Sequence, residues 1–116
     1  MRESSQMLID KGLKELRQEN WPAALAYFQK ATEENPDDAE AYYNLGVTYG
    51  SLGRYQDAIE AYKQAIRIKP DYAKAHNMLG VTYFAIGDNG AALEEYKILK
   101  TLDAELANKL FNLINK

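Results

Sequence analysis

The chain has no cysteine, a single histidine and almost no excess of charge. Without cysteine, disulfides, thiolate metal sites and cysteine nucleophiles are excluded. Its 14 Lys and Arg against 17 Asp and Glu give a net charge of −3, which does not favour nucleic acid as a partner. No apolar run approaches the roughly 20 residues that a membrane span needs, and the N-terminal segment lacks a secretory apolar core. We therefore expect one cytoplasmic domain of 116 residues that does not bind membranes.

Catalytic patterns are equally scarce. His76, the single histidine, has no serine or carboxylate at a spacing that would build a triad, and we interpret it as a packing residue. The segment 87–90 contains glycine but lacks the Lys-Ser/Thr of a phosphate-binding loop, so it is interpreted as a helix–helix turn. Paired carboxylates at 33–34, 37–38 and 94–95 are expected to be solvated. The sequence thus predicts a non-enzymatic protein without catalytic residues, cofactor or metal ion.

An internal period organises the chain. Gly12, Gly46 and Gly80 are separated by 34 residues each, and the same offset relates Ala24, Ala58 and Ala92. Aligning residues 39–72 with 73–106 gives 12 identities, where average residue usage predicts about two or three. A fixed period of this size is the signature of a repeat protein.

Each unit contains two amphipathic helical patterns with a break between them. In the second unit the break is at Gly53, and Pro36 and Pro70 end the first and second units. Asp37 and Glu40 have the spacing of a capping box for the helix that follows. A glycine inside a helix costs about 1 kcal/mol against alanine, so we expect the second helix of each hairpin to pack closely against Gly46 and Gly80.

These residues resemble the tetratricopeptide repeat, TPR. The second unit matches every position of that pattern, with Tyr42, Leu45, Gly46, Tyr49, Ala58, Tyr62, Ala65 and Pro70. The third carries His76, Leu79, Gly80, Tyr83, Ala92 and Tyr96 but departs at Leu99 and Ala104. The first carries Leu8, Gly12, Ala24, Phe28, Ala31 and Pro36 but departs at Lys11 and Glu15.

The resemblance implies an all-α fold, a right-handed superhelical solenoid of three helical hairpins. We place repeat 1 at about residues 5–38, repeat 2 at 39–72 and repeat 3 at 73–106, followed by a capping helix at about 104–116. A terminal hairpin needs such a cap for its apolar flank. The cap's stripe is Leu106, Leu110, Leu113 and Ile114, and Ile98, Leu99 and Leu102 are expected to receive it. Phe111 lies off this stripe and is expected to border the groove.

The resemblance also implies a concave groove lined by the first helix of each hairpin, where a partner protein or peptide would bind. The residues placed along it are Ile9, Leu13, Tyr43, Asn44, Val47, Gly50, Lys74, Asn77, Met78, Val81 and Phe84. Their mixture of apolar and amide side chains predicts a neutral or amphipathic peptide segment.

Some TPR domains clamp the acidic C-terminal tail of a chaperone with Lys, Asn, Asn, Lys and Arg. Asn44 and Lys74 match that set, but Ile9, Leu13 and Met78 occupy the other positions, so a chaperone tail is not the expected partner. Two alternatives to a peptide-binding adaptor stay open. One is self-association through the first helix or the tail into a homo-oligomer, and the other is a regulatory arm of a larger protein.

Overall fold

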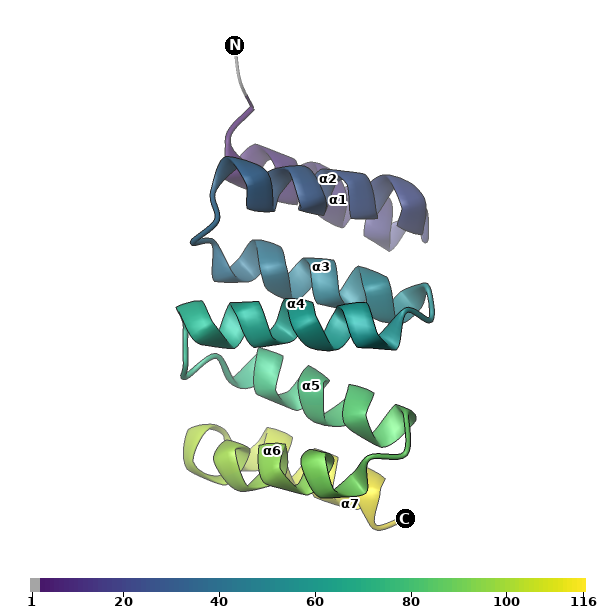
Figure 1. Cartoon of the computed structure of the whole chain (residues 1–116), viewed down its shortest axis with the longest axis vertical. Coiled ribbons are helices and arrows are strands. Elements are labelled where there is room, and N and C mark those ends of the chain that lie inside the picture. The colour runs from purple at the N-terminus through teal and green to yellow at the C-terminus, as the bar shows by residue number, and fades with distance from the viewer. Residues whose placement is uncertain (1–2) are drawn as a thin grey trace.

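A computed structural model describes residues 3–116, and the chain folds into helices stacked along one long axis (Figure 1). Over these residues there is no β-strand. The helices are α1 (Ser5–Arg17), α2 (Trp21–Glu34), α3 (Ala39–Ser51), α4 (Tyr55–Ile68), α5 (Ala73–Ala85), α6 (Asn89–Leu102) and α7 (Ala104–Ile114). The all-α solenoid with a final capping helix is therefore confirmed.

The helices form two layers, and the difference between the layers gives the molecule a concave side. α1, α3 and α5 begin at residues 5, 39 and 73, so the 34-residue period of the sequence is also the period of the structure. α1 contacts α3, α3 contacts α5 and α5 contacts α7, whereas within residues 3–116 α2, α4 and α6 do not contact one another. Because the odd-numbered helices lie closer together, their layer forms the inner face of the curve.

Short polar side chains start four of the helices. Ser4, Asp38, Asp88 and Asp103 each accept a hydrogen bond from a backbone N–H in the first turn of the helix that follows. This arrangement satisfies a donor that the helix itself leaves unpaired. The N-cap of α3 is Asp38 rather than Asp37, so the predicted capping box was wrong by one residue.

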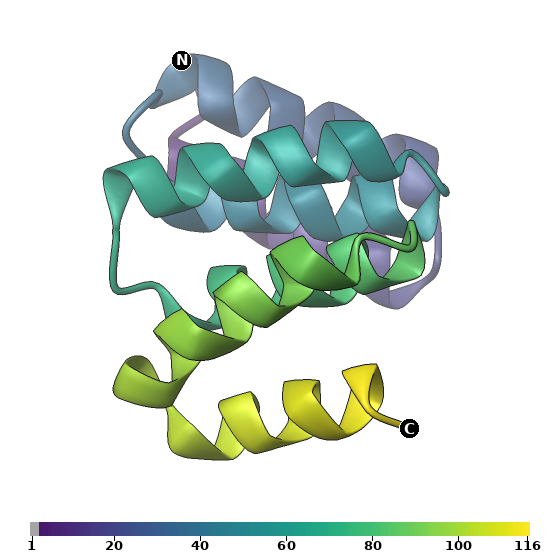
Figure 2. The same cartoon turned by 60° about the horizontal axis from the view of Figure 1, so that its bottom comes forward.

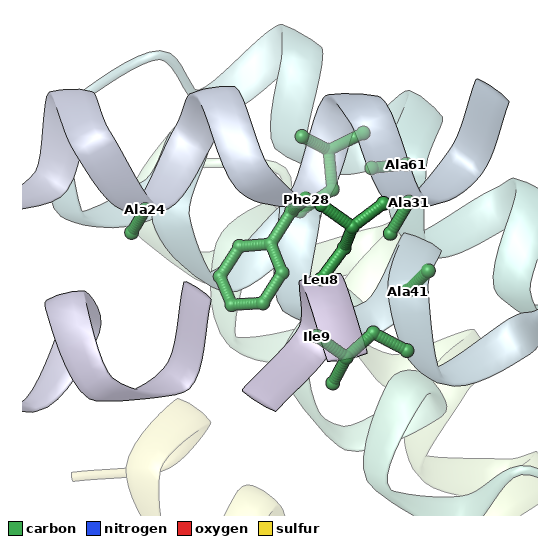
Figure 3. Packing of buried hydrophobic residues seen from close by; sticks show 8 residues of the cluster. Leu8, Ile9, Ala24, Phe28, Ala31, Ala41 and Ala61 are labelled. Carbon is green, nitrogen blue, oxygen red and sulfur yellow. The ribbon is translucent and has the colours of Figure 1, made fainter. Parts of the chain in front are cut away.

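The N-terminal core shows how small and large residues interlock. Leu8, Ile9 and Phe28 are fully buried, and they form one cluster with four buried alanines of α2, α3 and α4 (Figure 3), which are Ala24, Ala31, Ala41 and Ala61. The Phe28 ring lies against Gly12, and the Tyr62 ring lies against Gly46 in the same way. In the first two repeats the second helix therefore packs on the glycine of the first, as predicted for Gly46.

The third repeat packs differently: α6 approaches Gly80 closely at Glu95, as predicted, but the nearest side chain belongs to the capping helix α7. A Cβ at Gly80 would lie 2.6 Å from Cδ2 of Leu110 on α7 and 3.3 Å from Cβ of Glu95, while the ring of Tyr96 instead contacts Phe111 with centroids 5.1 Å apart. His76, 4% exposed, explains part of this arrangement. Its Nδ1 lies 2.7 Å from Glu95 Oε1 and its Nε2 lies 2.8 Å from the carbonyl oxygen of Pro70. The bond to Nδ1 holds Glu95 toward α5, at a position where the other repeats have an alanine or an aromatic residue.

The capping helix α7 follows α6 after one residue, Asp103, and lies along the end of the array (Figure 2). Its Ala107 and Leu110 are buried with Leu99 of α6, and Leu106, Leu113 and Ile114 pack around them as predicted. Ile98 and Leu102 do not receive the cap, since they remain 40% and 38% exposed. Phe111 lies on Tyr96 of the outer-layer helix α6, so it packs there instead of bordering the groove.

Candidate functional site: the concave face

The concave face is built from α1, α3 and α5, but not every residue predicted for it is accessible. Ile9 has 0% exposure and belongs to the N-terminal core, so its assignment to the groove was wrong. Asn44 is 6% exposed and contributes little surface. The others lie half-buried or exposed on the three helices, and they are Leu13, Tyr43, Val47, Gly50, Lys74, Asn77, Met78, Val81 and Phe84.

An apolar pocket of about 310 Å³ opens between α3 and α5, with α4 beneath it. Val47, Gly50, Met78 and Val81 line it, as does Tyr62 from α4. Val47 and Met78 also pack against the core of the second repeat, and Val81 packs against the α7 cluster. Their positions are therefore set by packing against the core.

Two hydroxyl groups at this pocket are already occupied. Thr82 Oγ1 donates to the carbonyl oxygen of Met78, and Ser51 Oγ donates to that of Val47. Because each hydroxyl bonds to its own helix, as serine and threonine inside helices commonly do, the pocket's wall is mainly apolar. An aliphatic or aromatic side chain suits such a space.

Three tyrosines hold one end of the concave face in place. The ring of Tyr43 on α3 lies 6.0 Å from that of Tyr62 and 5.4 Å from that of Tyr72, in the loop before α5. Burial raises the pKa of Tyr43 and Tyr62. Burial, followed by the nearby Glu40 carboxylate, raises the pKa of Tyr72 to about 12. All three side chains are neutral at physiological pH and connect α3, α4 and the loop before α5.

A second, larger pocket of about 600 Å³ lies between the start of α5 and the start of α7. Its charged residues include Lys69, Lys74 and Lys109 and also Asp71, Asp103 and Glu105. Because both signs of charge are balanced there, the pocket has no net electrostatic preference. Of the predicted groove residues only Lys74 lies in it, so the predicted set is divided between a polar and an apolar region.

Sequence reasoning missed five residues that line the apolar pocket. Tyr62 of α4 was assigned to the repeat pattern but not to the groove. Tyr55, at the start of α4, and Ala85, at the end of α5, come from positions that the repeat pattern does not assign to the groove. Ser51 and Thr82 were also missed, although each lies three or four residues from a predicted lining residue and therefore on an adjacent helical turn. Helical spacing from Val47 and Met78 is the signal that identifies them.

Residues 3–116 contain no group of three or more His, Asp or Glu side chains placed to hold a metal ion. In the same part of the chain no helix combines the length and the apolar character that crossing a membrane requires.

Comparison with known proteins identifies the class. The family model of the tetratricopeptide repeat matches residues 9–73 and 48–107, so the chain belongs to the TPR family, whose domains generally mediate protein–protein interactions. Human protein O-mannosyl-transferase TMTC3 is 44% identical over 45 residues, which are 39% of this chain and 5% of that protein. Superkiller protein 3 of Schizosaccharomyces pombe is 37% identical over 51 residues, 44% of this chain and 4% of that protein. The chain thus spans a small fraction of these curated relatives.

Solved structures share the whole architecture. The first TPR domain of Spaghetti (RPAP3), bound to the HSP90 peptide SRMEEVD, has a TM-score of 0.92 at 21% identity and covers 97% of this chain and 90% of its own. The TPR2B domain of yeast Sti1 in its pHsp70 complex has a TM-score of 0.90 at 21% identity, with 96% and 95% covered. MamA has a TM-score of 0.84 at 30% identity and covers 90% of this chain and 61% of its own. At these identities the first two establish the fold alone.

Proposed function

We propose that this TPR domain is a non-enzymatic adaptor that binds a neutral or amphipathic segment of a partner protein on its concave face. The observation that supports this proposal most directly is the apolar pocket between α3 and α5, which Val47, Met78 and Val81 line. One apolar side chain of the partner would enter this pocket, and its backbone would run along the half-buried Asn77 and Tyr43. Folded peptide-binding grooves commonly combine such an apolar anchor site with a few polar contacts.

Gly50 gives a direct test of this site. It lines the pocket, and a Cβ built there has no atom within 4 Å, so a side chain can begin at this position without a clash at its Cβ. Gly50→Leu fills the pocket and should weaken partner binding by at least tenfold, or about 1.4 kcal/mol. Gly50→Ala is the matched control, because it makes the same backbone change but leaves most of the pocket open.

The measurement begins with a photo-crosslinking amino acid at Ser51, which identifies the partner segment that lies at the pocket mouth in cell lysate. Titration of that segment as a synthetic peptide then compares the wild type with both Gly50 variants. Circular dichroism verifies that helicity is retained. Equal affinity for Gly50→Leu and Gly50→Ala would locate binding outside this pocket and contradict the proposal.

A chaperone tail is a defined competitor for the concave face. RPAP3 and Sti1 are TPR domains in complex with chaperone segments, so the fold itself does not argue against such a ligand. The side chains at the five clamp positions argue against it. Ile9 is fully buried, Leu13 and Met78 are apolar, and of the five only Lys74 presents an exposed charge. We expect the peptide SRMEEVD to show no saturable binding up to about 1 mM, which corresponds to a binding free energy weaker than about 4 kcal/mol. Tighter binding would assign the domain to the chaperone-binding group.

A further inference from the structure

The connection between α6 and α7 differs from the other connections between repeats. The earlier two, residues 35–38 and 69–72, contain Pro36 and Pro70, which prevent the helices on either side from joining. Between α6 and α7 there is only Asp103, and residues 102–105 contain neither proline nor glycine. The two helices are separate because this one residue is extended, with φ −157° and ψ 96°. A change at Asp103 to helical angles would join α6 and α7 into one helix from Asn89 to Ile114.

The backbone would gain hydrogen bonds from this joining. At present Asp103 N–H already donates to the Leu99 carbonyl, and Ala107 N–H donates to that of Asp103. In a continuous helix, Ala104, Glu105 and Leu106 would donate to Lys100, Thr101 and Leu102 in the same i to i−4 pattern. The loss on joining is the N-cap bond from Leu106 N–H to the Asp103 side chain. Three backbone bonds would therefore replace one capping bond.

The sequence across Asp103 already has the pattern of a single amphipathic helix. At 3.6 residues per turn, six apolar side chains on either side of the junction fall within about 120° of the helix circumference, namely Ile98, Leu99, Leu102, Leu106, Leu110 and Leu113. In the observed hairpin Ile98 and Leu102 are left 40% and 38% exposed, outside the cluster that α7 covers. A straight helix would place them on the same stripe as the buried residues of α7.

The contacts of α7 can equally be made by a second copy of the chain. α7 packs on α5 and α6 through Leu110 against Gly80 and through Ala107 beside Leu99. In the hairpin the space at Gly80 is filled by Leu110 of α7 and not by Tyr96 of α6, whereas Tyr62 of α4 fills the space at Gly46, so departure of α7 empties the space at Gly80. An unfilled apolar space of this kind is refilled at lowest cost by an identical helix.

We infer that two copies of this chain exchange their α7 helices. In the exchanged dimer α6 and α7 form one helix, Leu110 of each copy fills the space at Gly80 of the other, and the two long helices pair through Ile98 and Leu102. The interaction surface is the α5–α6 face that α7 covers in the monomer, and its partner is a second copy. This association leaves the pocket between α3 and α5 unchanged and does not depend on the proposed peptide binding.

Two substitutions at Asp103 test the hinge with opposite expected signs. Both remove the capping carboxylate, but alanine favours a continuous helix whereas glycine opposes it and is tolerated at an N-cap. Loss of the N-cap bond raises the equilibrium constant for joining α6 and α7 about fivefold at each hinge. Because the dimer contains two hinges, Asp103→Ala should raise the association constant of the dimer about 25-fold. Asp103→Gly should lower it below that of the wild type. A third variant, Ala104→Pro, changes the first residue of α7, a position that suits proline in the hairpin and blocks the continuous helix.

Each variant is unfolded in guanidinium and then refolded at about 10 μM and at about 1 mM, because a higher protein concentration favours exchange between copies. The molecular mass is then measured by light scattering after size exclusion. We expect a species of twice 13.2 kDa after concentrated refolding of the wild type, more of it for Asp103→Ala, and monomer for Ala104→Pro. Circular dichroism verifies that all variants are helical. Monomer for both the wild type and Asp103→Ala would overturn the inference, as would equal dimer for Asp103→Ala and Asp103→Gly.

Crosslinking identifies which helix is exchanged. Lys74 and Lys109 are exposed and line one pocket between α5 and α7, and the chain has no cysteine of its own. Lys74→Cys and Lys109→Cys are therefore refolded together at high concentration and treated with a short bis-maleimide. Crosslinked heterodimer from the mixture, at a yield well above that of either variant alone, supports the exchange. A dimer that gives no such crosslink associates through another face and overturns it.

Discussion

At the scale of single residues, the turn inside the first hairpin places a side chain on a backbone conformation that favours glycine. Gly53 and Gly87 have φ of 76° and 85° in the second and third hairpins, a region that glycine enters without steric cost. The equivalent residue in the first hairpin is Glu19, with φ of 59°. A non-glycine residue in this left-handed region costs on the order of 1 kcal/mol.

Glu19→Gly should therefore stabilise the domain by about 1 kcal/mol and raise its Tm by roughly 3–5 °C. The matched control is Glu19→Ala, which removes the same exposed carboxylate but keeps the Cβ responsible for the steric cost. Thermal unfolding followed by circular dichroism measures both variants. A gain of the same size for alanine would assign the effect to charge rather than to backbone conformation.

The tyrosines of the concave face predict a dependence of stability on alkaline pH. Because the pKa of Tyr72 is raised to about 12 in the fold, against about 10 in an unfolded chain, the unfolded state loses its proton first as the pH rises. Stability from the neutral side chain is complete below pH 10 and is lost between about 10 and 12. Urea unfolding between pH 8 and 11.5 should show this decline, with a smaller slope for Tyr72→Phe. An unchanged slope would show that Tyr72 titrates alike in both states.

At the scale of elements, the glycines inside the first helices decide how closely the second helix approaches. Gly46 contacts the ring of Tyr62, which is 1% exposed and has no room to move. Gly80 contacts the terminal methyl groups of Leu110 on α7, which can rotate. A Cβ added at Gly50 would meet no atom within 4 Å. The three glycines of α3 and α5 therefore have three different packing environments.

Replacement of these three glycines by alanine should give a graded series. Gly46→Ala should destabilise the domain by about 2 kcal/mol through overpacking. Gly80→Ala should cost less, about 1 kcal/mol, and Gly50→Ala should add about 0.5–1 kcal/mol of helix stability. Chemical unfolding of the three variants in parallel measures the order. If Gly80→Ala costs as much as Gly46→Ala, the packing of α7 on Gly80 is as rigid as that of a ring in the core.

At the scale of the whole molecule, stability depends on how many neighbours each unit has. Within residues 3–116, the helices α3, α4 and α5 are packed on both sides, while α1 and α2 have one neighbouring repeat and α7 contacts α5 and α6 alone. In a repeat protein the energy is a sum of each unit and its contacts with adjacent units. The ends of the array are therefore expected to open before its centre.

Hydrogen exchange should resolve this gradient. We expect amides of α7 to be at least tenfold less protected than those of α3 and α4, a difference of about 1.4 kcal/mol in the free energy of opening. Mass spectrometry of peptic fragments provides the measurement. Uniform protection over all helices would show that the array opens only as a single cooperative unit.

Much of the fold follows from the amino-acid sequence alone. The 34-residue period, the helix pairs, the turns at Gly53 and Gly87 and the close packing of the second helix on Gly46 depend on spacing and residue size within one repeat, and these are local properties that periodicity reveals. Val47 and Val81 were placed on the inner helices for the same reason, since they lie 34 residues apart at equivalent repeat positions, and Met78 lies about one helical turn before Val81.

Only the tertiary structure decided what happens where repeats meet unlike neighbours. The burial of Ile9, the filling of the space at Gly80 by Leu110, and the exposure of Ile98 and Leu102 all arise at the ends of the array. In these end repeats a side chain at a repeat position contacts a different residue from its equivalent in the central repeat, or is left exposed. The 34-residue pattern describes a repeat between two others, whereas the packing of a terminal repeat depends on contacts between residues far apart in the sequence.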